Sequence, residues 1–148
     1  MNWPAIATLV PHEAPMILLD RVLHADAETL RAEIELNAQS PFCVNGLVGA
    51  WIGIEYMAQA VAAHAGWLAL QRSEPVKVGF LLGSRRYQSS VPHFRAGQRL
   101  HVQAVRALQG DNGLGAFECA IADADGTSLA TATVTVFQPA DVKQFLQG

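Results

Sequence analysis

The chain has 148 residues, of which 51% are hydrophobic and 16% charged, and its formal net charge at pH 7 is −3. That length fits one domain with a core large enough to need neither disulfides nor a structural metal. The charges are interspersed, with no basic cluster, which argues against non-specific nucleic-acid binding. Cys43 and Cys119 stand apart and fit no metal-binding spacing, so we expect unpaired thiols in a reducing compartment, the cytoplasm.

Two strands are expected near the start of the chain. An apolar run over Met16–Leu23 follows Pro15 and predicts the first strand. Thr29–Leu36 alternates charged with apolar residues, which is typical of a half-buried strand. Asn37–Ala50 contains Pro41, Asn45, Gly46 and Gly49, and this composition predicts a loop that leads into the next element.

The segment Trp51–Leu70 is almost continuously apolar and has about the ~20 residues that a bilayer span requires. It nevertheless carries Glu55, Gln59 and His64, and alanine and glycine make up much of the rest. A helix of this kind is apolar on all sides because protein surrounds it. We therefore expect no membrane span but a buried central helix from about Ala50 to Gln71.

Four strand candidates follow the helix. They span Lys77–Tyr87, Arg99–Leu108, Leu114–Ile121 and Leu129–Val136. Gly-Asp-Asn-Gly at 110–113 and Asp-Ala-Asp-Gly at 123–126 mark the turns between the last three strands. Two strands, one long helix and then four strands predict a single α+β domain over residues 1–148.

Glu55 is the helix residue that most needs an explanation. At ~100° per residue it shares one face with Gln59, Ala62 and Gly66, which would leave room for a ligand along the helix. His64 points to the opposite side and cannot partner Glu55 within the helix. A buried carboxylate is costly unless it is paired. The pattern leaves two explanations open, a role in a site and a structural role satisfied by neighbouring backbone groups.

Several stretches, in order and at compatible spacing, resemble the β-hydroxyacyl-carrier-protein dehydratases of fatty-acid synthesis. Residues 9–22 form a Pro-His-x-x-Pro segment that runs into an apolar strand ending in Asp-Arg-Val, and residues 55–60 look like the Glu-Ala-Met-Ala-Gln helix motif. Residues 80–83 and 94–100 resemble the family's third-strand and turn segments. The resemblance covers nearly the whole chain. It implies a hot-dog fold, in which a curved antiparallel sheet wraps around one long central helix.

The stretch before the helix departs from that family. Typical dehydratases carry Gly-His-Phe-Pro-Gly there and use its histidine as the catalytic base, whereas residues 41–50 of this chain contain no histidine. In keeping Glu-Tyr-Met-Ala-Gln, the chain resembles the divergent dehydratase-like proteins of aryl-polyene pigment clusters. The resemblance implies dehydration of 3-hydroxyacyl thioesters in fatty-acid or polyene-type biosynthesis. The alternatives are an acyl thioesterase and a non-catalytic subunit that partners an active dehydratase.

Dehydration of such a thioester requires a proton to be taken from the carbon next to the carbonyl and another to be given to the departing hydroxyl. We assign these catalytic roles to Glu55 and His12, because His12 matches a position that the family keeps beside its acyl tunnel. A histidine in a turn that binds a backbone carbonyl is the alternative for His12. Amides at the helix N-terminus are expected to stabilise the enolate oxygen. The expected substrate-binding residues are Gly49, Ala50, Trp51 and Gln59.

The sequence contains no paired-histidine zinc spacing, no Gly-x-Ser-x-Gly elbow and no phosphate-binding glycine loop, so we expect no metal and no cofactor. The expected ligand is a thioester of an acyl carrier protein or of coenzyme A. Arg85, Arg86, Arg95 and Arg99 lie around one end of the predicted sheet and are candidates for binding an acidic carrier. The family's interfacial active sites imply a homodimer or higher oligomer, or a hetero-oligomer with a second dehydratase.

Overall fold

The computed structural model of the chain describes residues 3–12, 14–74, 80–110 and 112–137; of residues 80–82 and 85 it describes the backbone alone. Six antiparallel strands form the main sheet in the order β1-β2-β6-β7-β8-β4. Their bounds are Arg21–Ala25 for β1, Thr29–Glu35 for β2, Arg99–Gln109 for β6, Leu114–Asp123 for β7, Ser128–Phe137 for β8 and Phe80–Ser89 for β4. The expected strands are thus found, except that the first begins later than predicted, as described below, and that residues 77–79 lie outside the described part.

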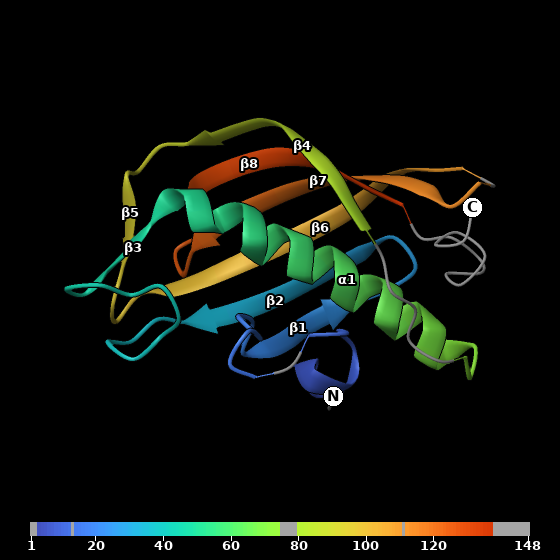
Figure 1. The fold of residues 1–148 in the computed structure, drawn as a ribbon, viewed down its shortest axis with the longest axis horizontal. Coiled ribbons are helices and arrows are strands. Elements are labelled where there is room, and N and C mark those ends of the chain that lie inside the picture. Colours follow the sequence, from blue (N-terminus) through green and yellow to red (C-terminus); the bar gives the residue numbers. More distant parts are fainter. Residues whose placement is uncertain (1–2, 13, 75–79, 111, 138–148) are drawn as a thin grey trace.

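The central helix also agrees with the prediction. A 3₁₀ turn, η2 (Ala50–Ile52), leads directly into α1 (Gly53–Gln71), and Figure 1 shows α1 lying across one face of the curved main sheet. Met57 and Ala60 on the helix are fully buried, as are Leu100 and Val102 on β6. None of the helices in the described ranges is long and apolar enough to cross a membrane.

The first strand begins later than the sequence predicts. Met16–Asp20 is not in the sheet, and the side chain of Gln59 explains why. Its Oε1 accepts a hydrogen bond from the backbone N–H of Leu18 at 2.8 Å, and its Nε2 donates one to the carbonyl of Met16 at 2.6 Å. A helix side chain therefore satisfies backbone groups that a neighbouring strand would otherwise satisfy.

The expected loop before the helix contains a short strand that the sequence analysis missed. β3 (Leu47–Gly49) pairs antiparallel with β5 (His93–Arg95), and these two strands form a separate small sheet. Val48 and Phe94 are register partners, and both are fully buried. Burial of this pair fixes the chain immediately before the helix.

The N-terminal segment packs closely against α1. It contains a 3₁₀ turn, η1 (Ile6–Thr8), followed by the fully buried Leu9. A Cβ atom at Gly66 would overlap the carbonyl oxygen of Leu9, so glycine is required for this approach. The expectation that Gly66 leaves room for a ligand was therefore wrong, because the chain's own backbone fills that space.

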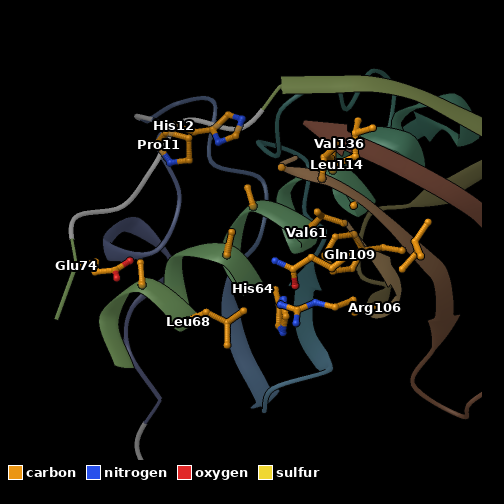
Figure 2. Close-up of a pocket in the computed structure, with 18 of the residues that line it drawn as sticks. Pro11, His12, Val61, His64, Leu68, Glu74, Arg106, Gln109, Leu114 and Val136 are labelled. Atoms are coloured by element: carbon orange, nitrogen blue, oxygen red, sulfur yellow. The ribbon is translucent and has the colours of Figure 1, made fainter. Parts of the chain in front are cut away.

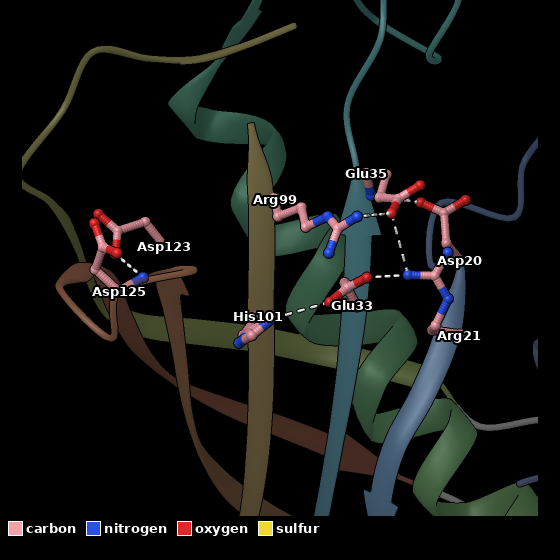
Figure 3. A network of polar contacts seen from close by, with 8 residues as sticks. All are labelled: Asp20, Arg21, Glu33, Glu35, Arg99, His101, Asp123 and Asp125. Carbon is pink, nitrogen blue, oxygen red and sulfur yellow. Dashed lines mark hydrogen bonds and ion pairs between the residues drawn. The ribbon is translucent and has the colours of Figure 1, made fainter. Parts of the chain in front are cut away.

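A charged cluster ties β1, β2 and β6 together on the face of the sheet away from the helix (Figure 3). Glu33 of β2 is only 6% exposed, and its carboxylate pairs with Arg21 of β1 and contacts the Nε2 atom of His101 of β6 at 3.1 Å. On the same face, Arg99 pairs with Glu35 at 3.1 Å. The predicted alternation along β2 holds, and partners on both neighbouring strands cover its central acid.

The two cysteines are free, as expected. Cys119 lies in the core, where burial raises the pKa of its thiol to about 12. This thiol therefore stays protonated at neutral pH and has a structural role.

Candidate active site

A pocket of about 240 Å³ lies along one side of α1 (Figure 2). The helix contributes a row of small side chains to its wall, and β6, β7 and β8 form the opposite wall, with Phe117 and Val136 among their residues. The small helix residues are Ala58, Ala62, Ala65 and Ala69. Because these side chains are short, space remains between the helix and the strands. The pocket's lining is mostly apolar and suits a hydrocarbon chain.

The structure brings both predicted catalytic residues to this pocket. Glu55 lines it from the first turn of α1, and His12 lines it from the N-terminal segment. The side chain of Glu55 is exposed rather than buried, which corrects the sequence-based expectation. Among the described residues none makes a hydrogen bond to Glu55 that would give it a structural role, and the buried Nδ1 atom of His12 also has no partner there.

The predicted oxyanion donors lie outside the pocket lining. The N–H of Ala50 donates a hydrogen bond to the carbonyl of Pro92 at 3.0 Å, and the hydroxyl of Tyr87 donates one to the Ala50 carbonyl. The Ala50 amide is therefore already used. At Gly49, a Cβ atom would overlap the indole ring of Trp51, which shows that glycine permits a close approach here.

Trp51 belongs to an exposed apolar surface at the N-terminal end of α1. Its side chain is 70% exposed and meets the ring of Phe42 edge-on, with centroids 6.4 Å apart. Val44 and Leu47 are exposed beside them in sequence. We refer to Phe42, Val44, Leu47 and Trp51 as the apolar end surface. Exposed large apolar side chains, two of them in contact, are typical of an interaction surface.

Gln59, predicted to bind substrate, does not line the pocket. Its side chain is 2% exposed, and its amide makes the two hydrogen bonds to residues 16–18 described above. These contacts give it a structural role. A helical wheel places Gln59 close to Glu55, but the pocket extends from Glu55 around the other side of the helix.

His64 is one of the polar pocket residues to which the sequence analysis gave no role. It lies about 180° from Glu55 around the helix, as predicted. The pocket nevertheless covers the helix surface between the two residues, with Glu55 at one edge and His64 at the other. The side chain is fully buried, and its Nε2 atom lies 3.0 Å from the carbonyl oxygen of Asp26. Burial lowers the pKa of His64, and the nearby Arg106 guanidinium, also in the pocket wall, lowers this pKa further.

The four arginines proposed for carrier binding differ in their surroundings. Arg86 and Arg95 are exposed, whereas Arg99 is engaged with Glu35. The side chain of Arg85 lies outside the described part of the chain. Among the side chains of this group that the structure describes, Arg86 and Arg95 therefore remain candidates for an acidic partner.

An antiparallel sheet wrapped around one long helix is the hot-dog arrangement, and solved structures confirm this class. The hypothetical thioesterase with coenzyme A from Streptococcus pneumoniae TIGR4 is 14% identical, with a TM-score of 0.63 over 80% of this chain and 84% of that one. The PaaI protein from the phenylacetic acid degradation operon of E. coli is 16% identical, with a TM-score of 0.63 over 79% and 81% of the two chains. At such identities these likenesses establish the fold.

The family follows from a much stronger likeness. The dehydratase heterocomplex ApeI:P from Xenorhabdus doucetiae contains a chain that is 31% identical, with a TM-score of 0.90 over 99% of this chain and 98% of that one. The model of the ApeP-like family, described as ApeP dehydratase, matches residues 4–147. Among curated proteins, none matches this chain. The chain belongs to the ApeP-like dehydratase family, and the predicted hot-dog fold and divergent dehydratase function are confirmed.

Proposed function

We propose that this chain is one subunit of a two-subunit dehydratase and that Glu55 carries out one of its proton transfers. The dehydratase acts on 3-hydroxyacyl chains held by an acyl carrier protein. The observation that carries the proposal is the position of Glu55, exposed at one edge of a pocket whose helix wall includes four alanines. A carboxylate without a structural partner at the mouth of an apolar pocket is suited to acid–base chemistry.

The reaction needs two groups. One takes the proton from the carbon next to the thioester carbonyl, the electron pair of that C–H bond forms the new C=C bond, and the C–O bond breaks. The other group gives a proton to the leaving hydroxyl, which departs as water. After the reaction the base carries one proton more and the acid one proton fewer. Transfer of one proton from the base to the acid, by way of solvent, restores both groups. His12 supplies the second group in this proposal, because it lines the same pocket and its Nδ1 atom has no partner among the described residues.

A second subunit is supported by two observations. The apolar end surface begins one helical turn before Glu55, where exposed Trp51 and Phe42 are in contact. Covering such a surface removes apolar area from water and stabilises an interface. The relative from Xenorhabdus doucetiae is described as a dehydratase heterocomplex. The partner in this proposal is therefore a second dehydratase subunit, which covers this surface beside Glu55.

The test uses the purified chain, alone and mixed with a dehydratase subunit that carries Gly-His-Phe-Pro-Gly, and a 3-hydroxyacyl thioester of the carrier protein. Mass spectrometry of the carrier arm measures the enoyl product. Glu55→Gln should reduce the rate at least about a hundredfold, the lower end of general acid–base contributions. The matched control is Glu28→Gln, which changes an exposed acid outside the pocket and should retain full activity.

His12→Ala tests the second group, with His93→Ala as its control on the exposed surface of β5. A comparable loss in His12→Ala alone supports the pair of Glu55 and His12. Loss in Glu55→Gln but not in His12→Ala assigns the second group to the other subunit. Equal rates for Glu55→Gln and Glu28→Gln would show that this chain is a non-catalytic partner. Release of free thiol without enoyl product would identify a thioesterase instead.

A further inference from the structure

The start of the central helix is held by a side chain of the main sheet. Tyr87 lies on β4, and its hydroxyl donates a hydrogen bond to the carbonyl of Ala50, the first residue of η2. Burial raises the pKa of Tyr87, so the hydroxyl keeps its proton at neutral pH and stays a donor. Tyr87 does not line the pocket beside Glu55. Any effect of this hydroxyl on the reaction therefore passes through the backbone that it holds.

Gly53, the first residue of α1, leaves the space that this contact needs. A Cβ atom at Gly53 would overlap the hydroxyl of Tyr87 and would lie 3.0 Å from Cδ1 of Ile121. A side chain at this position would therefore push the tyrosine ring away from the Ala50 carbonyl. The N–H of Gly53 also donates to that carbonyl. The helix and β4 thus meet at one oxygen atom, and a glycine in the helix allows the tyrosine to reach it.

Ala50 is held through both of its backbone polar groups. Its N–H donates to the carbonyl of Pro92 at 3.0 Å, while its carbonyl accepts from Tyr87. Tyr87 and Pro92 both belong to the part of the chain that runs from β4 to β5, so one segment fixes Ala50 from two directions. Glu55 follows five residues later, in the first turn of α1. Because helix geometry sets each residue relative to the preceding turn, a shift at Ala50 carries over to Glu55.

Glu55 depends on this backbone for its position. Its side chain is exposed, and among the described residues none makes a hydrogen bond that would fix the carboxylate. We propose that Tyr87 is a positioning residue for Glu55. Through the Ala50 carbonyl it fixes the first turn of α1, and with it the place of the carboxylate at the pocket edge. This inference rests on the proposed function for the catalytic role of Glu55, and it adds the strand, β4, that places the carboxylate.

The experiment compares the two tyrosines of the chain. Tyr87→Phe removes the hydroxyl that binds Ala50, and Tyr56→Phe removes a buried hydroxyl that makes no hydrogen bond to a described residue. In the assay of enoyl formation with both subunits, Tyr87→Phe should lower kcat about 10- to 100-fold, the effect of moving a catalytic group by up to ~1 Å. KM should change less than about twofold, because Tyr87 does not line the pocket. A kcat equal to that of Tyr56→Phe, or a loss in KM alone, overturns the proposal.

A double variant separates positioning from stability. In Gly53→Ala/Tyr87→Phe the methyl group added at residue 53 takes the space that the hydroxyl leaves, although its contact with Ile121 needs a small shift. Urea unfolding should show this variant to be more stable than Gly53→Ala alone, in which the methyl group overlaps the hydroxyl. The Ala50 carbonyl still lacks its donor on β4, so kcat should stay at the level of Tyr87→Phe. A return of kcat to the wild-type value together with stability would show that Tyr87 has a structural role alone.

A second pair of changes tests the route through Glu55. Tyr87→Phe should slow the wild-type protein but should not slow Glu55→Gln further, because it acts on a carboxylate that this variant lacks. A further loss of about tenfold in Glu55→Gln/Tyr87→Phe overturns that route, whether or not the Gly53 variants fold. The two proposals fail separately. Full activity of Glu55→Gln would reject the catalytic role of Glu55, whereas loss in Glu55→Gln with full activity in Tyr87→Phe would retain that role and reject the positioning by β4.

Discussion

Replacing Gln59 by leucine tests whether this glutamine is structural. Gln59→Leu leaves the N–H of buried Leu18 without an acceptor, which costs about 1–3 kcal/mol. It also removes a hydrogen bond to the carbonyl of Met16, a half-exposed residue whose carbonyl can turn to water, and this loss is about 1 kcal/mol. The free energy of unfolding should therefore fall by about 3 kcal/mol. For a chain of this size the midpoint of thermal unfolding should fall by roughly 6–12 °C.

Urea unfolding followed by circular dichroism measures this change, and Gln103→Leu is the matched control. Gln103 lies half-exposed on β6 and makes no side-chain hydrogen bond among the described residues, so its replacement should change stability by no more than about 0.5 kcal/mol. If Gln59→Leu were as stable as Gln103→Leu, the structural explanation would be refuted. A raised KM at unchanged stability would show that Gln59 binds substrate after all.

Gly66→Ala places a methyl group against the N-terminal segment and should lower the free energy of unfolding by about 1–3 kcal/mol. Gly83→Ala, whose methyl group meets nothing within 4 Å, is the control and should leave stability unchanged. Thermal unfolding compares the two variants. His64 has a folded-state pKa below its ordinary 6.5, so the folded protein binds fewer protons and stability falls as pH drops below about 6.5. This pH dependence should become shallower in His64→Phe, as urea unfolding between pH 7.5 and 5 would show. If the carrier is an acidic protein, its affinity should weaken as salt is added and in Arg86→Glu or Arg95→Glu. Titration at low and high salt measures this affinity. An affinity that does not change with salt would point to coenzyme A thioesters or an apolar docking surface.

Much of the fold could be predicted because its signals are local. The all-round apolar segment around Met57 required a surrounded helix, and the alternation along β2 and β8 required half-buried strands. The segment Met16–Leu19 has the composition of a strand but not its pairing. Its backbone partner is a side chain 41 positions away, and no local pattern indicates such a contact.

The candidate site could be predicted only in part for the same reason. Glu55 and His12 were found through the resemblance of their motifs, and both line the pocket. His64 was placed correctly on the helix but assigned no role. A helical wheel shows which residues share a face of the helix, but it does not show how much of the helix surface borders the pocket. The hydrogen bond from the Ala50 amide to the Pro92 carbonyl depends on the position of β5. A strand of three residues gives too short a pattern to be predicted from the sequence.

The order of the strands has a consequence for how the chain folds. β6, β7 and β8 are consecutive in sequence and adjacent in the sheet, so their pairing closes only short turns. Pairing of β2 with β6, in contrast, closes a loop that contains the whole of α1. Such long-range closure has an entropic cost before its contacts form. We expect the β6–β8 meander to form early, and attachment of β2 to set the folding rate.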